Sequence, residues 1–117
     1  MITLTGQAKS TNHIYKYACR GNNPCMYLSD LGSTLKQQYA LEARAQWRSQ
    51  PLKGDVEVSI SFFHGDKRKR DVDNYNKLIL DSLSGRIYDD DKQIVKLHIE
   101  KYYDKEKPRI EINIKEL

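Results

Sequence analysis

Alternation of apolar and polar residues is the feature that most constrains what this chain can fold into. The clearest run extends from Val56 to Phe62, where apolar side chains occupy every second position and Glu or Ser stands between them. Successive side chains of a β-strand point to opposite faces, so this run predicts a strand with one buried face. The same pattern predicts further strands at 1–5, 95–99 and 110–114, with a less regular candidate near 15–19.

Two helices are expected between these strands. From Leu31 to Trp47 an apolar residue recurs every fourth position, which predicts one apolar helix face over about 30–48, with Ser29 as N-cap and Pro51 beyond the end. A second helix is expected over about 73–84, and Gly85 suits the left-handed residue that terminates a helix.

The order of elements predicts an α+β fold, in which two helices pack on one mixed or antiparallel sheet. The last two strands, joined by a turn at 104–108, are expected to pair as an antiparallel hairpin. A length of 117 residues fits one domain spanning 1–117. Because so short a chain buries a limited share of its surface, a homodimer is a reasonable expectation.

No segment is apolar enough to span a membrane, and the first residues lack the form of a signal peptide. We therefore expect a cytoplasmic protein without a membrane partner. Its two cysteines, Cys19 and Cys25, are expected to remain reduced, since no zinc-ligand spacing accompanies them.

The net charge of +4 is unevenly distributed. Residues 1–50 hold six Lys and Arg against two acidic residues, and four tyrosines lie among these cations. The remaining residues hold equal numbers of each sign, but cations and anions form separate clusters there. This segregation suggests a polyanionic partner such as a nucleic acid.

The densest cluster is a basic run, Lys67-Arg68-Lys69-Arg70, directly followed by Asp71 and Asp73. In an extended segment residues two apart point the same way, so both carboxylates can face one point. Lys77 follows one helical turn after Asp73, on the same side. A second acidic cluster, Asp89-Asp90-Asp91, follows the second helix and can return close to the first.

Several carboxylates that converge without His or Cys are the ligand set of a hard divalent cation such as Mg²⁺. A bound metal could polarise a phosphate and lower the pKa of a water, which is the usual route to phosphodiester hydrolysis. Lys77 could stabilise charge on the phosphate or position the attacking water. Simpler readings exist for each part: Asp caps helices, a run of Asp forms a turn, and a basic run is a solvated loop.

Two segments carry a resemblance to a known family. Residues 70–77 read Arg-Asp-Val-Asp-Asn-Tyr-Asn-Lys, and residues 85–94 read Gly-Arg-Ile-Tyr-Asp-Asp-Asp-Lys-Gln-Ile. Both resemble the signature segments of the RusA family of Holliday junction resolvases, nucleases carried largely by phages and prophages. Ser10-Thr11-Asn12, with Tyr15, is similar to the family's Ser-x-Asn element, although Ala8-Lys9 stands where the family usually has Pro-Pro.

The resemblance implies an α+β homodimer that makes paired, symmetric cuts in four-way DNA junctions with Mg²⁺, or with Mn²⁺ in its place. Carried over by position, it makes Asp71, Asp73 and Asp91 the catalytic, metal-binding carboxylates, with Asp90 assisting, and Lys77 the catalytic lysine. It also implies DNA contacts by the basic run and the N-terminal segment, for which we name Lys67, Arg68, Lys69, Arg70, Asn12 and Lys16.

Two other functions remain open on the residues alone. The chain could be a non-catalytic nucleic-acid-binding module whose acidic residues are turns and caps. It could also be a small interaction protein whose basic patch docks an acidic partner. The three histidines show no spacing typical of a metal site or a catalytic triad, and His98 falls at an outward strand position, which predicts a surface histidine.

Overall fold

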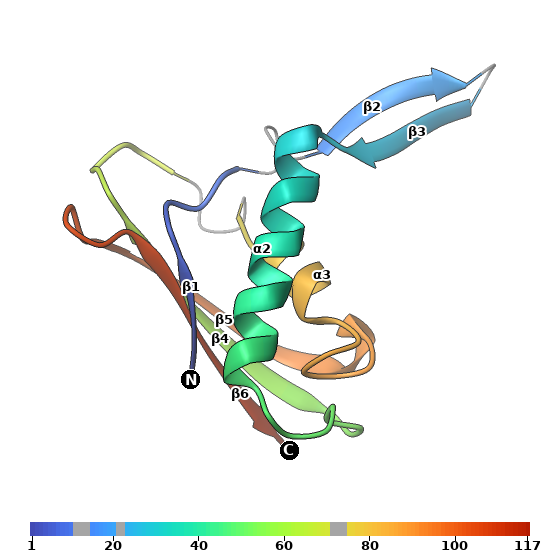
Figure 1. The fold of residues 1–117 in the computed structure, drawn as a ribbon, viewed down its shortest axis with the longest axis vertical. Coiled ribbons are helices and arrows are strands. Elements are labelled where there is room, and N and C mark those ends of the chain that lie inside the picture. Colours follow the sequence, from blue (N-terminus) through green and yellow to red (C-terminus); the bar gives the residue numbers. More distant parts are fainter. Residues whose placement is uncertain (11–14, 21–22, 71–74) are drawn as a thin grey trace.

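A computed structural model describes residues 1–10, 15–20, 23–70 and 75–117, and for 15–20 and 23–27 it describes the path of the backbone. The elements in chain order are β1 (Ile2–Thr5), β2 (Tyr15–Arg20), β3 (Asn23–Leu28), α2 (Asp30–Gln46), β4 (Val56–His64), α3 (Lys77–Leu83), the 3₁₀ turn η1 (Asp91–Gln93), β5 (Ile94–Tyr103) and β6 (Arg109–Glu116) (Figure 1). Four strands form one sheet with α2 and α3 on one face, which confirms the α+β expectation. No helix in the described part of the chain is long and apolar enough to cross a membrane.

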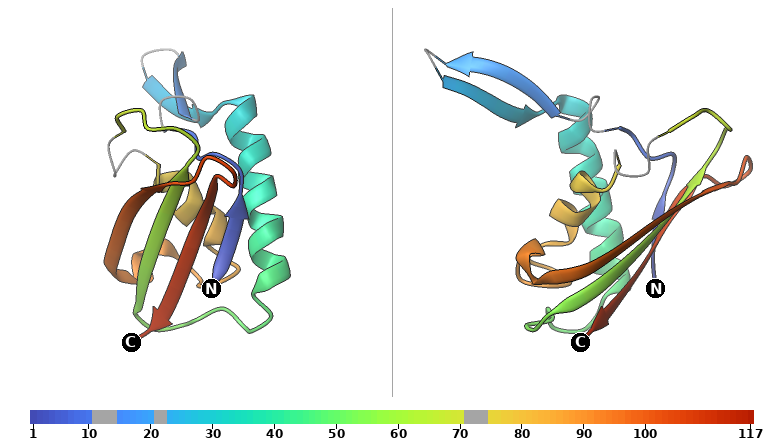
Figure 2. Two further views of the ribbon diagram at one scale, coloured as in Figure 1. Left: turned by 90° about the vertical axis from the view of Figure 1, so that its left-hand side faces the viewer. Right: turned by 180° about the vertical axis from the view of Figure 1, so that it is seen from behind.

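The sheet is mixed, with strand order β1-β6-β4-β5 (Figure 2). β4 pairs antiparallel with β6 and parallel with β5. The expected hairpin of the last two strands is therefore wrong: β4 lies between β5 and β6. The physical reason is that the turn after β5 crosses the end of β4, where the Asp104 amide donates to the His64 carbonyl over 2.8 Å.

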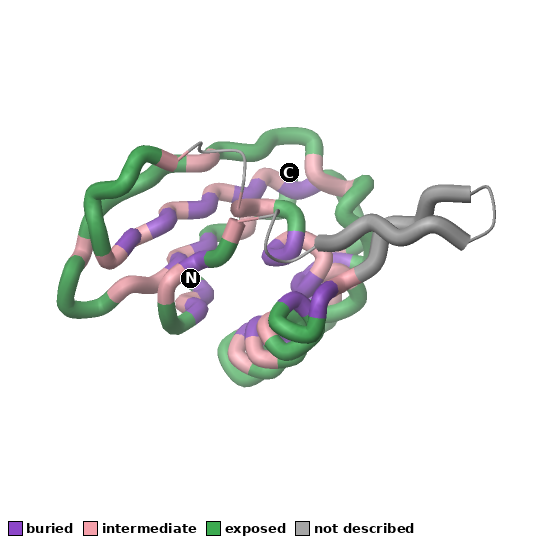
Figure 3. The backbone as a smooth tube through the Cα atoms, turned by 90° about the horizontal axis from the view of Figure 1, so that it is seen from above, coloured by how far each residue is buried: buried purple, intermediate pink, exposed green. Residues whose placement is uncertain are grey.

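The core lies between the sheet and the two helices. Every second residue of β4 is buried, as the alternation predicts, and buried residues of β1 and β6 extend the same face. Seen from above, the buried positions face one another across this single layer (Figure 3). The helical side of the sheet is thus apolar, and the opposite side carries the polar residues of the alternating pattern.

α2 forms where its capping and periodicity predict. The Ser29 hydroxyl accepts a hydrogen bond from the Gly32 amide at the N-terminus. Tyr39 and Ala43 are buried as expected, whereas Leu31 of the same predicted face is exposed, because it lies on the first turn beyond the core.

Side chains of α2 also cover one edge of the sheet. Gln46 exchanges two 2.8 Å hydrogen bonds with the backbone of Thr3, and Glu42 accepts one from the Thr5 amide. The backbone groups of β1 that would otherwise form an open edge are thus paired. The other edge, β5, keeps most of its side chains exposed.

α3 is shorter than predicted, because its first helical residue is Lys77, and residues 73 and 74 lie outside the described part. Gly85 has φ +82°, which confirms its expected role after the helix. The β2–β3 hairpin extends beyond the N-terminal end of α2 (Figure 1), and its second strand was not predicted, because Pro24 and the neighbouring Asn residues read as a turn.

Candidate functional site

α3 carries a basic and an acidic group on one side. Lys77 and Asp81 are four residues apart, and the Lys77 Nζ lies 3.4 Å from the Asp81 Oδ2. The Lys77 side chain is 48% exposed and that of Asp81 is 27% exposed. Lys77 was predicted from sequence and Asp81 was not; the i, i+4 spacing from Lys77 was the available signal.

The chain that follows α3 returns as a series of tight turns. The Gly85 amide donates to the Tyr88 carbonyl over 2.7 Å, and the buried Tyr88 hydroxyl donates to the Leu80 carbonyl over 2.8 Å. Burial raises the pKa of Tyr88 well above its ordinary value, so the hydroxyl keeps its proton and this bond. Tyr88 thereby fixes the segment that leads into Asp90 and Asp91 against the last turn of α3.

Gln93 attaches this acidic turn to the rest of the molecule. Its Nε2 donates to the carbonyls of Leu52 and Gly54, each over 2.8 Å, and its Oε1 accepts from the Asp90 amide over 2.9 Å. One side-chain amide thus makes three hydrogen bonds to the backbone. Gln93 therefore sets the position of η1 and of the two carboxylates at its start.

Asp90 and Asp91 have different environments although they are neighbours. The Asp90 carboxylate accepts the Lys92 amide over 3.0 Å as the cap of η1, and this bond, with a further hydrogen bond from Asp91, lowers the pKa of Asp90. The structural reading of Asp as a cap is therefore correct for Asp90. The pKa of Asp91 is raised, first by the hydrogen bond with Asp90, and then by burial and by the charges of Asp90 and Asp81.

Charges on α3 also influence the acidic turn. The charge of Asp81 raises the pKa of Asp91, and the ammonium of Lys77 lowers it. Lys77, Asp81 and Asp90 therefore all act electrostatically on Asp91, while the catalytic roles expected of Lys77, Asp90 and Asp91 stay predictions. Asp71 and Asp73, the other predicted carboxylates, lie outside the described residues.

The donor chemistry fits a hard divalent cation in part. The acidic groups at this site offer carboxylate oxygens only, which Mg²⁺ prefers, and crowding of their negative charge is what a bound cation relieves. Among the side chains that the structure describes, no three of His, Cys, Asp or Glu are gathered closely enough to hold a metal ion. The described carboxylates therefore supply part of a ligand set rather than a complete one.

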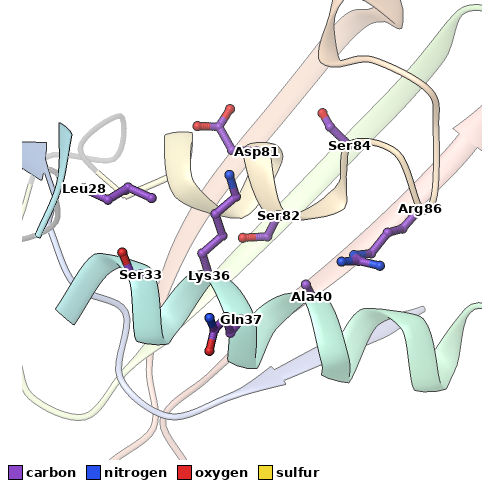
Figure 4. Close-up of a pocket in the computed structure, with 9 residues that line it drawn as sticks. All are labelled: Leu28, Ser33, Lys36, Gln37, Ala40, Asp81, Ser82, Ser84 and Arg86. Atoms are coloured by element: carbon purple, nitrogen blue, oxygen red, sulfur yellow. The ribbon is translucent and has the colours of Figure 1, made fainter. Parts of the chain in front are cut away.

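A groove of about 530 Å³ opens beside the site, between α2 and α3 (Figure 4). Asp81 forms part of the wall of this groove, and the Lys36 side chain extends from α2 toward Asp81. Arg86 lines the other end, and most of the remaining lining is polar. The acidic site thus has cations at its border, where a phosphate backbone would need them.

The basic run forms a loop after β4, as predicted. Lys67, Arg68 and Lys69 are exposed. Arg70 differs: its side chain is 11% exposed and its guanidinium lies 2.8 Å from the Asp66 carboxylate, which raises the pKa of Arg70. In this structure Arg70 organises the loop, and the other three cations are available at its surface.

The start of this loop is fixed by Gln7 and His64. The Gln7 Oε1 accepts the Gly65 amide over 2.6 Å, which orients the Gln7 amide so that its Nε2 donates to the His64 Nδ1 over 2.7 Å. His64 is consequently neutral, with its proton on Nε2. Burial, followed by the charges of Arg70 and Lys101, lowers the pKa of His64.

Of the remaining residues considered in the sequence, the side chains of Asn12 and Lys16 cannot be placed and that of His98 can. Asn12 lies outside the described residues, as does the side chain of Lys16. His98 is exposed and its Nε2 lies 2.9 Å from the Glu57 carboxylate, which confirms a surface histidine.

Comparison with known proteins supplies the family. The family model described as Endodeoxyribonuclease RusA matches residues 7–115 of the 117. A protein of Bacillus subtilis (strain 168), called Uncharacterized protein YqaN, is 49% identical over 49 residues, which are 42% of this chain and 34% of that protein. This chain thus spans about a third of the curated relative that it matches, and the name of that relative assigns no activity. Because the family match covers nearly the whole chain and includes both acidic segments and the basic loop, the chain belongs to the RusA family of endodeoxyribonucleases, enzymes that hydrolyse phosphodiester bonds in DNA.

Proposed function

We propose that this chain is a Mg²⁺-dependent endonuclease that resolves Holliday junctions by paired, symmetric cuts, with Mn²⁺ able to replace Mg²⁺. The observation that carries the proposal is the RusA family match over residues 7–115, which includes both acidic segments, together with the placement of Asp90 and Asp91 at the start of η1. The charges of Asp90 and Asp81 oppose ionisation of Asp91, and a bound cation would offset them.

Asp91, Asp71 and Asp73 are proposed to hold the metal, and Asp90 to assist them. When bound, Mg²⁺ would polarise the scissile phosphate and lower the pKa of a water. Asp90 is proposed to assist mainly by fixing the position of Asp91, because the Asp90 carboxylate already caps η1. The raised pKa of Asp91 means that this carboxyl gains most from a nearby positive charge.

Lys77 is proposed to act on the substrate itself. Its ammonium lies at the N-terminal end of α3, and the Asp81 carboxylate 3.4 Å away restrains it without enclosing it. An ammonium in this place can offset the negative charge that develops on a phosphate during hydrolysis. It can equally orient the water that attacks, and both roles need the same position.

DNA contacts are proposed for the exposed cations of the basic loop and for the N-terminal segment. Lys67, Arg68 and Lys69 offer three adjacent positive charges for a phosphate backbone, and Asn12 and Lys16 extend this set. Arg70 is proposed to contact phosphate only through the edge that its pairing with Asp66 leaves accessible.

A homodimer is proposed because two symmetric cuts require two sites. The exposed edge strand β5, with Val95 and Leu97 on its surface, offers an apolar border where a second copy could pair. The chain is proposed to act as one domain, because the family match extends from residue 7 to residue 115, and to work in the cytoplasm, where such junctions arise in bacteria.

A junction-cutting assay tests this function. A labelled four-way junction incubated with the protein should give paired nicks at symmetric positions in Mg²⁺ and none in EDTA. Linear duplex of the same sequence should be cut far more slowly. Absence of cutting in Mg²⁺ and in Mn²⁺ would contradict the proposal.

A non-catalytic DNA-binding module is the second candidate, favoured by the capping role of Asp90. Such a module would bind DNA with an affinity that falls steeply as salt rises, and would leave the strands intact in Mg²⁺. The same assay, read for binding and for cutting, separates the two functions.

A further inference from the structure

β5 ends in two exposed tyrosines beside the basic loop. Tyr102 is 46% exposed and Tyr103 is 45% exposed, although large aromatic side chains are usually buried. The loop after β4 and the turn after β5 lie at the same end of the sheet in both views of Figure 2. Neither tyrosine is among the residues assigned above to metal binding, catalysis or DNA contact.

Tyr103 faces the basic loop. It lies opposite His64 in the register of β4 and β5, and the Lys67 Nζ lies 5.2 Å from the centre of its ring. A hollow of about 270 Å³ is lined by Tyr103, Tyr102 and the cations of the loop. The ring and the ammonium therefore border one open space.

Tyr102, which also borders this hollow, packs against β4. Its ring stacks on Phe63 with centroids 5.1 Å apart and planes 19° apart, and the Arg109 guanidinium lies 3.9 Å from the Phe63 centroid. Arg109 is itself paired with Asp104 and Glu111. These contacts connect the end of β5, next to Tyr103, with β4 and β6.

Aromatic rings beside a cluster of cations are typical of surfaces that bind unpaired nucleotides. The cations hold the phosphates, and each base stacks on a ring with little regard to its identity. In a duplex the bases are already stacked on one another, but at a branch point or in a single strand their faces are accessible. The ammonium of Lys67 would also be drawn to a phosphate, which would clear the face of Tyr103 that it now covers.

We propose that Tyr103 is a stacking platform for a base whose face is exposed, at a branch point or in a single strand of the DNA substrate, with Lys67, Arg68 and Lys69 holding the adjacent phosphates. This inference rests on the proposed function for the identity of the substrate as DNA. It adds to that function a reason for preferring branched over linear DNA, since an opened branch point exposes the face of a base that continuous stacking covers in linear duplex.

The test measures binding in EDTA, so that its outcome does not depend on cleavage. The probes are a thymidine oligonucleotide that contains one 2-aminopurine and a fully paired duplex of equal length. Tyr103→Leu should weaken binding of the single strand by about tenfold and abolish the quenching of 2-aminopurine, and it should change duplex affinity less than about twofold. Tyr103→Phe keeps the ring and should behave as the unaltered protein.

Lys67→Gln serves as the matched control for charge. It should weaken both probes to a similar extent and reduce the dependence on salt, because a phosphate contact carries no preference for unpaired bases. Circular dichroism and sedimentation of each variant show whether folding and oligomeric state are retained.

Equal binding of the single strand by Tyr103→Leu and the unaltered protein would overturn the platform, and so would an equal loss for both probes. A change of oligomeric state in Tyr103→Leu that accounts for the lost affinity would also overturn it, because the ring would then belong to an interface between copies. A protein that shows the Tyr103 effect but never cuts a junction would instead contradict the nuclease and leave the platform standing.

Discussion

The Lys77 Nζ and the Asp81 Oδ2 lie 3.4 Å apart on successive turns of α3. An exposed pair at this spacing usually contributes about 0.3–0.5 kcal/mol to stability. Here both partners also influence the protonation of Asp91, Lys77 favouring its charged form and Asp81 opposing it. The pair is therefore better understood as part of the acidic site than as a device that stabilises the helix.

Loss of the Lys77 ammonium should impair cutting far more than folding. Lys77→Gln is expected to slow single-turnover junction cutting by at least about 100-fold, or about 2.7 kcal/mol in the barrier. Loss of its pair with Asp81 should lower the free energy of urea unfolding by no more than about 0.5 kcal/mol. Asp81→Asn breaks the same pair and serves as control: equally small effects of both variants on cutting would reduce Lys77 to a helix-surface residue.

Removal of the Asp91 carboxylate should abolish cutting without loss of junction binding. Asp91→Asn takes away a proposed metal ligand, so we expect a fall of at least about 100-fold in the cutting rate. Binding in EDTA should be unchanged or tighter, since one charge that repels phosphate is gone. Asp89→Asn is the matched control, because Asp89 pairs with Lys53 on the surface and should cut within about twofold of the unaltered protein.

Protonation of His64 should destabilise the fold at mildly acidic pH. The pKa of His64 is lowered from 6.5, so between 6.5 and the folded value the unfolded chain binds more protons than the folded chain. This part of the stability is complete above about pH 6.5 and is lost as the pH falls through the folded pKa. Urea unfolding from about pH 7.5 to about pH 5 measures it.

The control for this pH dependence is His64→Asn, which offers an amide oxygen near the position of Nδ1 and cannot titrate in this range. The variant should be less stable at neutral pH, because the ring contacts with Phe62 and Tyr75 are lost. Its stability should nevertheless fall less steeply toward acid. An identical slope in both proteins would show that His64 does not carry the effect.

Gln93 should be as important for placing the acidic turn as the carboxylates are for its chemistry. Gln93→Met preserves volume but loses the hydrogen bonds to Leu52, Gly54 and Asp90, so we expect a loss of about 1–3 kcal/mol in unfolding free energy. Lys92→Gln, at an exposed neighbour, should leave stability within about 0.5 kcal/mol. Similar stability of the two variants in thermal unfolding would contradict the anchoring role.

The positions of the strands in the sequence could be predicted more reliably than the order in which they pair in the sheet. Alternation identified β4, β5 and β6, although only β4 and β6 bury apolar residues of one face in the core and most of β5 is exposed. It could not reveal that β4 separates β5 from β6, since a five-residue turn can close a hairpin or cross the end of one strand. That choice depends on tertiary hydrogen bonds such as the one from Asp104 to His64.

The parts of the site that a short sequence motif contains could be predicted. Asp90 and Asp91 were expected just before a strand and Lys77 on the second helix, and the structure has them at the start of η1 before β5 and at the first residue of α3. The coupling of Asp81 to Asp91 depends on how α3 and the following turns fold back, which no short motif encodes. The burial of Arg70 against Asp66 was missed for the same reason, because four adjacent cations read as a uniformly solvated run.

A crystal soaked in manganese tests the central claim most directly, because the anomalous signal locates the metal without reference to activity. We predict one peak within coordination distance of the Asp91 carboxylate, at about 2.0–2.2 Å, that also contacts Asp71 or Asp73. The peak should be absent from Asp91→Asn crystals grown and soaked in the same way. A peak remote from Asp91, or full occupancy in the Asp91→Asn protein, would contradict the account.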